Sequence, residues 1–202
     1  MSTTSRPAST EKPFHHGSLQ RAALDAAWGI VSDAGPNALS LRDVAKRQGV
    51  THRALYRHFA DKADLELAVV AEGFSRLAAA MQQSLAGDAG KTEPKLAVVE
   101  AYVRFALAHA GPYRLMFSQK ASALMAHAGT SAAVNAVIKV ALEAFGQPDL
   151  VGNQRLSTRD EVMRAWAQAH GLVDLWFGGI LRARNADEAE AYIVRQLRTQ
   201  LA

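Results

Sequence analysis

Apolar residues recur at intervals of three and four along most of this chain, the spacing that places them on one face of an α-helix. The first stripe begins near residue 18 and stops at Gly35 and Pro36. A longer stripe over 62–87 starts behind a capping residue, Asp61. Further apolar helices are predicted over 96–109, 132–145, 159–181 and 187–201. The pattern therefore predicts a chain built from helices.

Two short helices are predicted between the first two stripes. Ser40 and Asp43 form a capping box that opens the first of them, and Gly49 can take the left-handed conformation that ends it. Thr51 can cap the second, which we expect over 52–59. The two helices should therefore meet at a tight turn.

Polar segments separate the remaining helices. The connections fall at 87–93, 146–158 and 182–186, of which 146–158 is the longest internal loop. Residues 1–16 are rich in Ser, Thr and Pro and are expected to form a flexible arm. Abundant Ala, Leu and Val with few Thr, Tyr and Ile favour helix over strand, so the fold class is all-α.

The composition excludes several classes of protein. The 202 residues include no Cys, which rules out disulfides and thiolate metal sites. The N-terminus lacks the apolar stretch of a secretory signal, and no run approaches the roughly 18 apolar residues that span a bilayer. We therefore expect a soluble, cytoplasmic protein.

Charge is concentrated more than it is abundant. The net charge is only +4, but residues 40–62 carry six basic side chains against Asp43 and Asp61. The six are Arg42, Lys46, Arg47, Arg53, Arg57 and Lys62. This excess favours an anionic partner, although a solvated face is the commoner use of such charges.

Residues 39–65 form the most informative segment. Ala45 lies four residues before Gly49, so we expect the two short helices to cross closely there. Val44, Val50, Leu55 and Phe59 can fill the space between these helices and the first one. The N-terminal turn of the second short helix then faces outward, which is the base-reading end of a recognition helix.

Candidate DNA contacts follow from this arrangement. His52, Arg53 and Arg42 are the candidates for base edges, and Arg53 can pair bidentately with a guanine in the major groove. Candidate phosphate donors are Ser40, Thr51, Tyr56, His58 and Lys62. The helix N-termini at Ser40 and Thr51 also favour an anion.

Structural alternatives stay open for several of these residues. Tyr56 can instead be a core aromatic with a wet hydroxyl, and His58 can be a surface histidine packed on Phe59. Arg57 is better interpreted as a solvated charge than as a contact.

Residues 17–67 resemble the N-terminal domain of the TetR family of bacterial transcription regulators. The resemblance is carried by the run from Leu55 to Phe59, followed by Asp61 and Lys62. It implies that Tyr56, His58 and Lys62 hold phosphates and that residues 51–53 read bases.

The remainder of the chain shows no pattern typical of a catalytic site. It has no Gly-rich phosphate loop, no Gly-x-Ser-x-Gly elbow and no His-Glu-x-x-His zinc helix. His109, His127 and His170 have no spacing that implies shared metal coordination. We therefore predict no enzyme, no cofactor and no metal site.

Residues 165–179 are similar to the Trp-His-Gly signature of one class of TetR-family C-terminal domains, through Trp166, His170 and Gly171. Residues 111–117 also resemble that class. The resemblance implies a homodimer through helices 159–181 and 187–201. A partner would also cover 172–181, where only Asp174 is charged.

The family resemblance implies three parts: an arm over 1–16, a helix-turn-helix DNA-binding domain over 17–64, and a helical ligand-binding and dimerisation domain over 65–202. Candidate pocket residues, each of which can equally be a core residue, are Tyr102, Phe105, Met116, Phe117, Met125, Trp166, His170 and Phe177. The scarcity of charge there favours an apolar or weakly polar small molecule.

These observations predict a sequence-specific, double-stranded-DNA-binding regulator, a repressor released from a palindromic operator by a small-molecule ligand. A low-specificity architectural DNA-binding protein is the main alternative. A helical enzyme or small-molecule carrier is a third.

Overall fold

The computed structural model describes residues 16–146 and 153–201, and within these ranges it contains helices and no strand. The expected all-α fold is therefore confirmed. The elements are α1 (His16–Ala34), the 3₁₀ helix η1 (Pro36–Ala38), α2 (Leu41–Gln48), α3 (His52–Leu55), α4 (Lys62–Ala86), α5 (Asp88–Thr92), α6 (Pro94–Ala108), α7 (Ala110–Ser118), α8 (Ala121–Ala126), α9 (Ala128–Phe145), α10 (Asn153–Phe177) and α11 (Ala186–Leu201).

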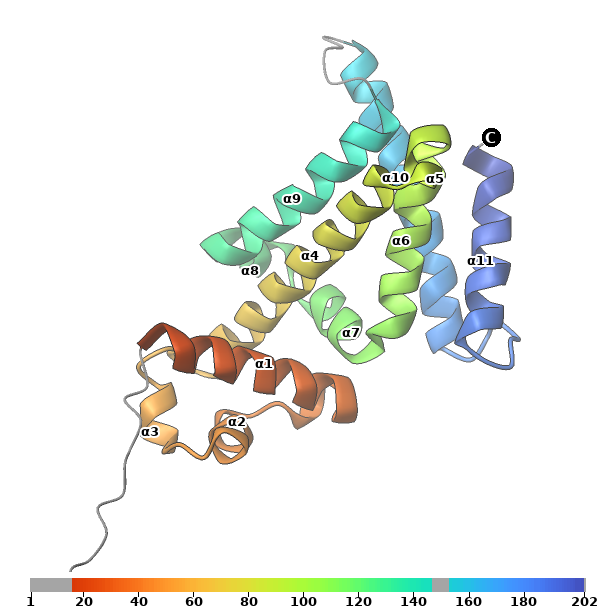
Figure 1. The fold of residues 1–202 in the computed structure, drawn as a ribbon. Coiled ribbons are helices and arrows are strands. Elements are labelled where there is room, and N and C mark those ends of the chain that lie inside the picture. The colour runs from red at the N-terminus through yellow and green to blue at the C-terminus, as the bar shows by residue number, and fades with distance from the viewer. Residues whose placement is uncertain (1–15, 147–152, 202) are drawn as a thin grey trace, which may run out of the picture.

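The long helix α4 connects the two ends of the molecule (Figure 1). It contacts α1 and α7 as well as α5, α6 and α9. Its buried side is the stripe that the sequence pattern predicts, and it includes Leu65, Val69, Val70, Phe74, Leu77 and Met81. This stripe makes α4 part of one continuous core with the helices around it.

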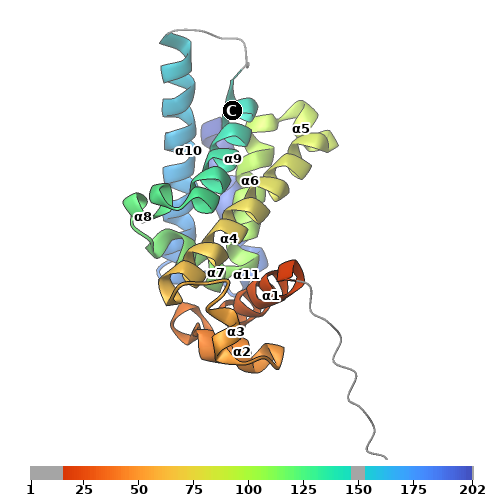
Figure 2. The same cartoon turned by 90° about the vertical axis from the view of Figure 1, so that its left-hand side faces the viewer.

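Helices α1, α2 and α3 gather at one end of the molecule (Figures 1 and 2), and Figure 1 shows α11 apart from them. Helix α1 packs on α2, α4 and α7. Ala23, Ala27 and Val31 on α1 are fully buried, as are Val44 on α2 and Leu55 on α3. The small helical unit at this end is therefore built around α1.

The other end is assembled around α6, which is buried on most sides. It packs between α4 and α9 on one side and α10 and α11 on the other. Helices α10 and α11 pack on α6 and on each other but leave several large apolar side chains exposed. These are Met163, Trp166, Leu175 and Tyr192, with Ile180 just beyond α10.

Helix α9 changes one expectation about the chain. By length and composition alone it is apolar enough to cross a membrane, although no segment of the sequence was expected to be. In the fold it packs against α4, α6 and α10, and Val140, Ala144 and Phe145 are buried in the core. One third of α9 is buried, so it packs on its neighbours through one face.

Helix boundaries differ from the prediction at several places, and α7 and α8 were not predicted. The expected connection over 87–93 contains α5, and α6 begins directly at Pro94. Helix α10 begins at Asn153, inside the expected loop 146–158, and ends at Phe177 rather than at 181. The glycine pair that follows ends it, because Gly179 takes a left-handed φ of +73°.

Some predictions concern residues outside the described ranges. The arm over 1–16 lies there almost entirely, as does the part of the expected loop over 147–152. The division at 64/65 falls inside α4, which serves both ends of the molecule, and it stays a prediction.

Candidate nucleic-acid interface

Helix α2 begins at the predicted cap, Ser40, but only half of the expected capping box forms, because the Asp43 carboxylate meets the Ser40 hydroxyl and not a backbone N–H. The backbone N–H of Asp43 donates to the Ser40 hydroxyl oxygen at 3.1 Å, and that hydroxyl donates to the Asp43 carboxylate at 2.5 Å. Leu41 and Val44 point into the core, which leaves Arg42 exposed on the first turn. Both polar groups of Ser40 and Asp43 that were predicted to cap the helix are thus engaged with each other.

The turn between α2 and α3 depends on the backbone of Gly49. Its φ of +64° and ψ of 25° are left-handed, and its N–H donates to the Ala45 and Lys46 carbonyl oxygens. A Cβ added to Gly49 would have nothing within 4 Å, so our expectation that glycine is needed for a close crossing of the two helices is wrong. The left-handed conformation is the reason for glycine here.

Helix α3 is shorter than the predicted 52–59. It ends at Leu55, and the N–H groups of His58 and Phe59 both turn back to the Leu55 carbonyl oxygen, at 2.8 and 2.9 Å. Leu55 and Phe59 are buried and fix this segment to the core. The expected helix is therefore one helical turn followed by hydrogen-bonded turns.

The N-terminal side of α3 carries aromatic and basic side chains in water. Thr51, His52 and Arg53 are exposed, and the His52 ring meets the Tyr56 ring edge-on, with centroids 4.8 Å apart. Tyr56 is 49% exposed, so it is not a core aromatic. His58 is half-buried beside the buried Phe59.

A second capping box fixes the start of α4 next to α3. The Asp61 carboxylate accepts from the N–H of Asp64 at 2.9 Å, and the Asp64 carboxylate accepts from the N–H of Ala60 at 2.9 Å. Lys62, in the first turn, is exposed and lies 3.4 Å from Glu66. Lys62 thus remains at the surface at the point where the α3 segment joins α4.

The predicted DNA-contacting residues therefore fall on α2 and its cap, on α3 and the turns that flank it, and on the first turn of α4. Figure 1 shows these elements at the end of the molecule remote from the α10 label. Most are exposed: Arg42, Thr51, His52, Arg53, Tyr56 and Lys62. Arg47, counted in the local basic excess, lies 3.4 Å from Asp33 and covers Gly29 of α1. Its role is at least in part to hold α2 on α1.

The predicted pocket residues do not all lie together. Trp166 Nε1 donates to the Tyr102 hydroxyl at 3.1 Å, and that hydroxyl lies 2.7 Å from the Tyr113 hydroxyl. The Tyr113 hydroxyl is 2.6 Å from His170 Nδ1. We call this group the aromatic cluster; its members are Tyr102, Tyr113, Trp166 and His170. Tyr113 was not among the predicted pocket residues.

Other pocket candidates lie around or outside this cluster. Phe117 packs on Tyr113, Trp166 and His170, and Phe177 packs on Tyr113. Phe105 packs on His109 instead, Met116 is fully buried, and Met125 is 53% exposed on α8. Met125 is therefore not part of a shared core with the others.

Burial keeps the aromatic cluster uncharged near neutral pH. It raises the pKa of both Tyr102 and Tyr113 well above the ordinary value of a tyrosine. It also lowers the pKa of His170, although the nearby Asp174 acts in the opposite direction. The cluster is thus a chain of neutral donors and acceptors.

Both parts of the molecule match known proteins. Residues 23–69 match the profile of "Bacterial regulatory proteins, tetR family", and residues 95–199 match "Tetracyclin repressor-like, C-terminal domain". The transcriptional activator FasR of Mycolicibacterium smegmatis is 32% identical over 121 residues. That stretch is 60% of this chain and only 52% of FasR, so the match spans about half of the relative.

Solved structures share the whole fold. A protein of unknown function from Rhodococcus sp. RHA1 superposes with a TM-score of 0.73 and 29% identity, over 95% of this chain and all of that one. The TetR-like regulator LfrR of Mycobacterium smegmatis, solved in complex with proflavine, has a TM-score of 0.55 at 20% identity, over 91% of this chain and 95% of LfrR. With a matching helix-turn-helix unit, a matching C-terminal region and this common fold, the chain belongs to the TetR family of bacterial regulatory proteins.

Proposed function

We propose that this DNA-binding regulator is a dimeric, sequence-specific repressor that a small molecule releases from a palindromic operator. The observation that carries the proposal is the exposed N-terminal turn of α3, with Arg53 and His52 on it, held rigidly by the buried Leu55 and the left-handed Gly49. A rigid, exposed helix start is the part of a helix-turn-helix that enters the major groove.

Arg53 is the proposed main base reader, with Arg42 on α2 as the second. Both side chains are exposed at the first turn of their helices. A guanidinium in the major groove can donate to both guanine acceptors, a contact worth about 1–3 kcal/mol of discrimination. His52 is a weaker candidate, because its ring packs on Tyr56.

Thr51, Tyr56, His58 and Lys62 are the proposed phosphate contacts. Tyr56 and Lys62 lie on either side of the turn that follows α3, with the hydroxyl and the ammonium group at the surface. Ser40 is a less favourable donor than the sequence suggests, because its hydroxyl already donates to Asp43. Its backbone position at the start of α2 still favours a phosphate.

A dimer through α10 and α11 is supported by the apolar side chains that these helices leave in water. Met163, Trp166 and Leu175 of α10 and Tyr192 of α11 are exposed. Large apolar side chains exposed on two neighbouring helices favour an interface at this surface. A twofold axis there would set two α3 helices about one DNA turn apart, roughly 34–36 Å, and would require a palindromic operator.

The aromatic cluster is the proposed place where an effector acts. Rings from α6, α7 and α10 meet there, so a molecule inserted among them would shift three helices at once. The neutral hydrogen-bonded chain suits an apolar or weakly polar molecule rather than an ion. LfrR, which has the same fold, was solved with the aromatic molecule proflavine bound. Assignment of this region to the Trp-His-Gly class remains part of the proposal, as does a cytoplasmic location.

Selection of bound duplexes from a random-sequence pool tests the central claim. A dimeric specific regulator should enrich an inverted repeat and prefer it about a thousandfold over random duplex. If no sequence is enriched although the protein binds DNA in dilute salt, the architectural alternative replaces this proposal. A reporter gene behind the selected sequence then distinguishes repression from activation. FasR is named as a transcriptional activator, so both outcomes occur among the relatives to be considered.

A further inference from the structure

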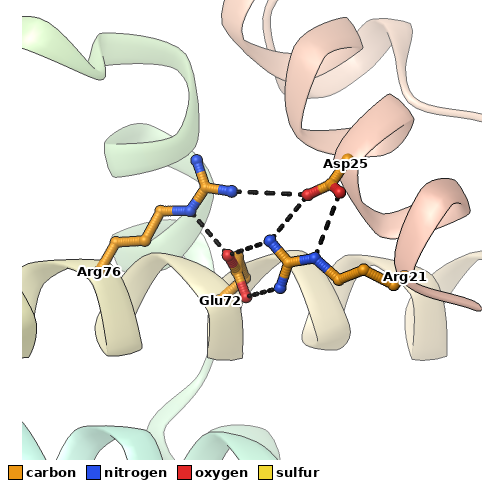
Figure 3. A network of polar contacts seen from close by, with 4 residues as sticks. All are labelled: Arg21, Asp25, Glu72 and Arg76. Carbon is orange, nitrogen blue, oxygen red and sulfur yellow. Dashed lines mark hydrogen bonds and ion pairs between the residues drawn. The ribbon is translucent and has the colours of Figure 1, made fainter. Parts of the chain in front are cut away.

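Four charged side chains join α1 to α4, outside the candidate interface (Figure 3). The Arg21 guanidinium on α1 donates to both carboxylate oxygens of Glu72 on α4, at 3.0 and 3.1 Å. It also donates to both oxygens of Asp25, one turn further along α1, at 2.8 and 3.2 Å. Arg76 Nε donates to Glu72 at 2.7 Å, and its Nη2 lies 3.7 Å from Asp25 Oδ1. We call these four residues the α1–α4 charge cluster.

Glu72 is the centre of this cluster. Its side chain is only 15% exposed, whereas the Arg21 side chain is 54% exposed. Burial acts to raise the pKa of Glu72, but the hydrogen bonds from Arg21 and Arg76 outweigh burial and lower it. The paired donors of Arg21 fix direction as well as distance, which a single surface ion pair does not do.

The same cluster continues into the α6–α7 corner. The Arg76 guanidinium lies over the Trp28 ring of α1 at 4.1 Å, and that ring meets His109 edge-on at 5.5 Å. Near the end of α1, a Cβ on Gly111 of α7 would collide with the Val31 carbonyl oxygen, so the two backbones touch. Helix α1 is therefore fixed by side chains toward its start and by backbone contact toward its end.

Helix α1 in turn determines where the candidate interface sits. It packs on α2, and α2 packs on α3 through the turn at Gly49. A change in the angle between α1 and α4 therefore rotates the exposed start of α3 relative to α10 and α11. None of the four charged residues belongs to the candidate DNA contacts, so an effect of these residues on half-site spacing would act through this angle.

We propose that Glu72 is a positioning residue for operator binding, which holds α1 through Arg21 and so sets the half-site spacing that the dimer accepts. This inference rests on the proposed function, because spacing has a meaning only for two recognition helices related by a twofold axis. With the cluster intact, one spacing fits both helices. Without Glu72 the two helix-turn-helix units tilt more freely, and neighbouring spacings fit as well.

The test is a parallel selection from one random-sequence duplex pool with the wild type, Glu72→Gln, Arg21→Met and the double variant. The readouts are the half-site sequence and the distribution of half-site spacings. Each variant should enrich the wild-type half-site, because its base-reading side chains are intact. The preference over a duplex with one extra base pair between half-sites should fall from about tenfold or more in the wild type to about threefold or less. The double variant should be no worse than either single one, because both remove the same link.

A matched control uses an ion pair that does not involve α1. Lys91 and Asp88 pair within α5 at 2.9 Å, outside both α1 and the proposed dimer helices, and Asp88→Asn should keep the wild-type spacing. Thermal unfolding shows whether each variant is folded. If Glu72→Gln does not fold, Arg21→Lys replaces it in the test, because lysine keeps the charge but loses the paired donors. This variant should give a range of half-site spacings between those of the wild type and Arg21→Met.

The outcomes separate the two proposals. A folded Glu72→Gln protein with the narrow wild-type spacing overturns the positioning role, and so does one that enriches a different half-site. A wild type that enriches no inverted repeat overturns the proposed function itself.

Discussion

Replacing Gly111 with alanine tests how closely α7 approaches α1. The new Cβ would lie 3.0 Å from the Val31 carbonyl carbon and closer still to its oxygen. Carbon atoms pack best at about 3.5–4.0 Å, so α7 must retreat by at least about 0.5 Å. The Val31 carbonyl oxygen also accepts the Gly35 N–H at 3.0 Å at the end of α1, so it has little freedom to move.

Overpacking costs about 1–3 kcal/mol, and the very short contact with the Val31 oxygen places this site in the upper part of that range, at about 2–3 kcal/mol. Exchanging a helical glycine for alanine returns about 0.8–1 kcal/mol. We expect a net loss of about 1–2 kcal/mol in the free energy of unfolding. For a chain of this length each kcal/mol corresponds to about 2–4 °C, so Tm should fall by about 2–8 °C. Thermal unfolding followed by circular dichroism, at one protein concentration, measures this.

Gly29→Ala is the matched control within α1. Its Cβ would meet only the guanidinium of Arg47, at 3.3–3.4 Å, and that flexible group can move aside. Its Tm should stay the same or rise. A Gly111→Ala protein as stable as the wild type would refute the close backbone contact, and with it the second anchor of α1.

Three further changes test other features of the structure. Gly49→Ala should lower the free energy of unfolding by about 1 kcal/mol, because φ is positive at this position. Gly49→Asn should lower it less. Equal losses for the two variants in thermal unfolding would contradict the left-handed turn. Arg53→Ala should weaken binding to the selected operator by about 1–3 kcal/mol and relax one base preference. Lys62→Ala should instead weaken binding to all duplexes and reduce the salt slope by about 1. A uniform loss of affinity from Arg53→Ala in binding titrations would remove Arg53 as a base reader. The pKa of Glu72 is lowered from 4.5 in the folded protein, so its ionised form stabilises the fold above pH 4.5. This stabilisation is lost as the pH falls through the pKa of the folded state. The wild type should therefore be more stable than Glu72→Gln at pH 7 and lose that advantage below pH 4.5, as acid denaturation would measure.

Local signals in the sequence were sufficient for most helix boundaries in the N-terminal region. The capping residues Ser40 and Asp61 and the turn at Gly49 are where the pattern predicts them, because each is decided by contacts within four residues. The length of α3 was overestimated, since buried Leu55 and Phe59 suit either a helix or a helical turn followed by bends. The apolar run at the end of α10 suggested more helix than the following glycines permit.

Contacts between distant segments could not be predicted from the sequence. Arg21 and Glu72 are 51 positions apart, and Tyr113 and His170 are 57 apart, so no periodicity connects them. The aromatic cluster was therefore found only in part, with Tyr113 omitted and the exposed Met125 included. The exposure of Arg42, Arg53 and Lys62 could be anticipated, because the buried positions of the same short segment determine which way they face.

The length of α4 gives small movements a large effect. Its 25 residues extend about 37 Å at 1.5 Å per residue, from the cap beside α3 to the start of α5. A tilt of about 5° around the distant end displaces the first turn by about 3 Å, which is close to the 3.4 Å rise per base pair of the duplex. A tilt of only a few degrees at the α5 end of α4 is therefore enough to move the cap beside α3 by about one base-pair step.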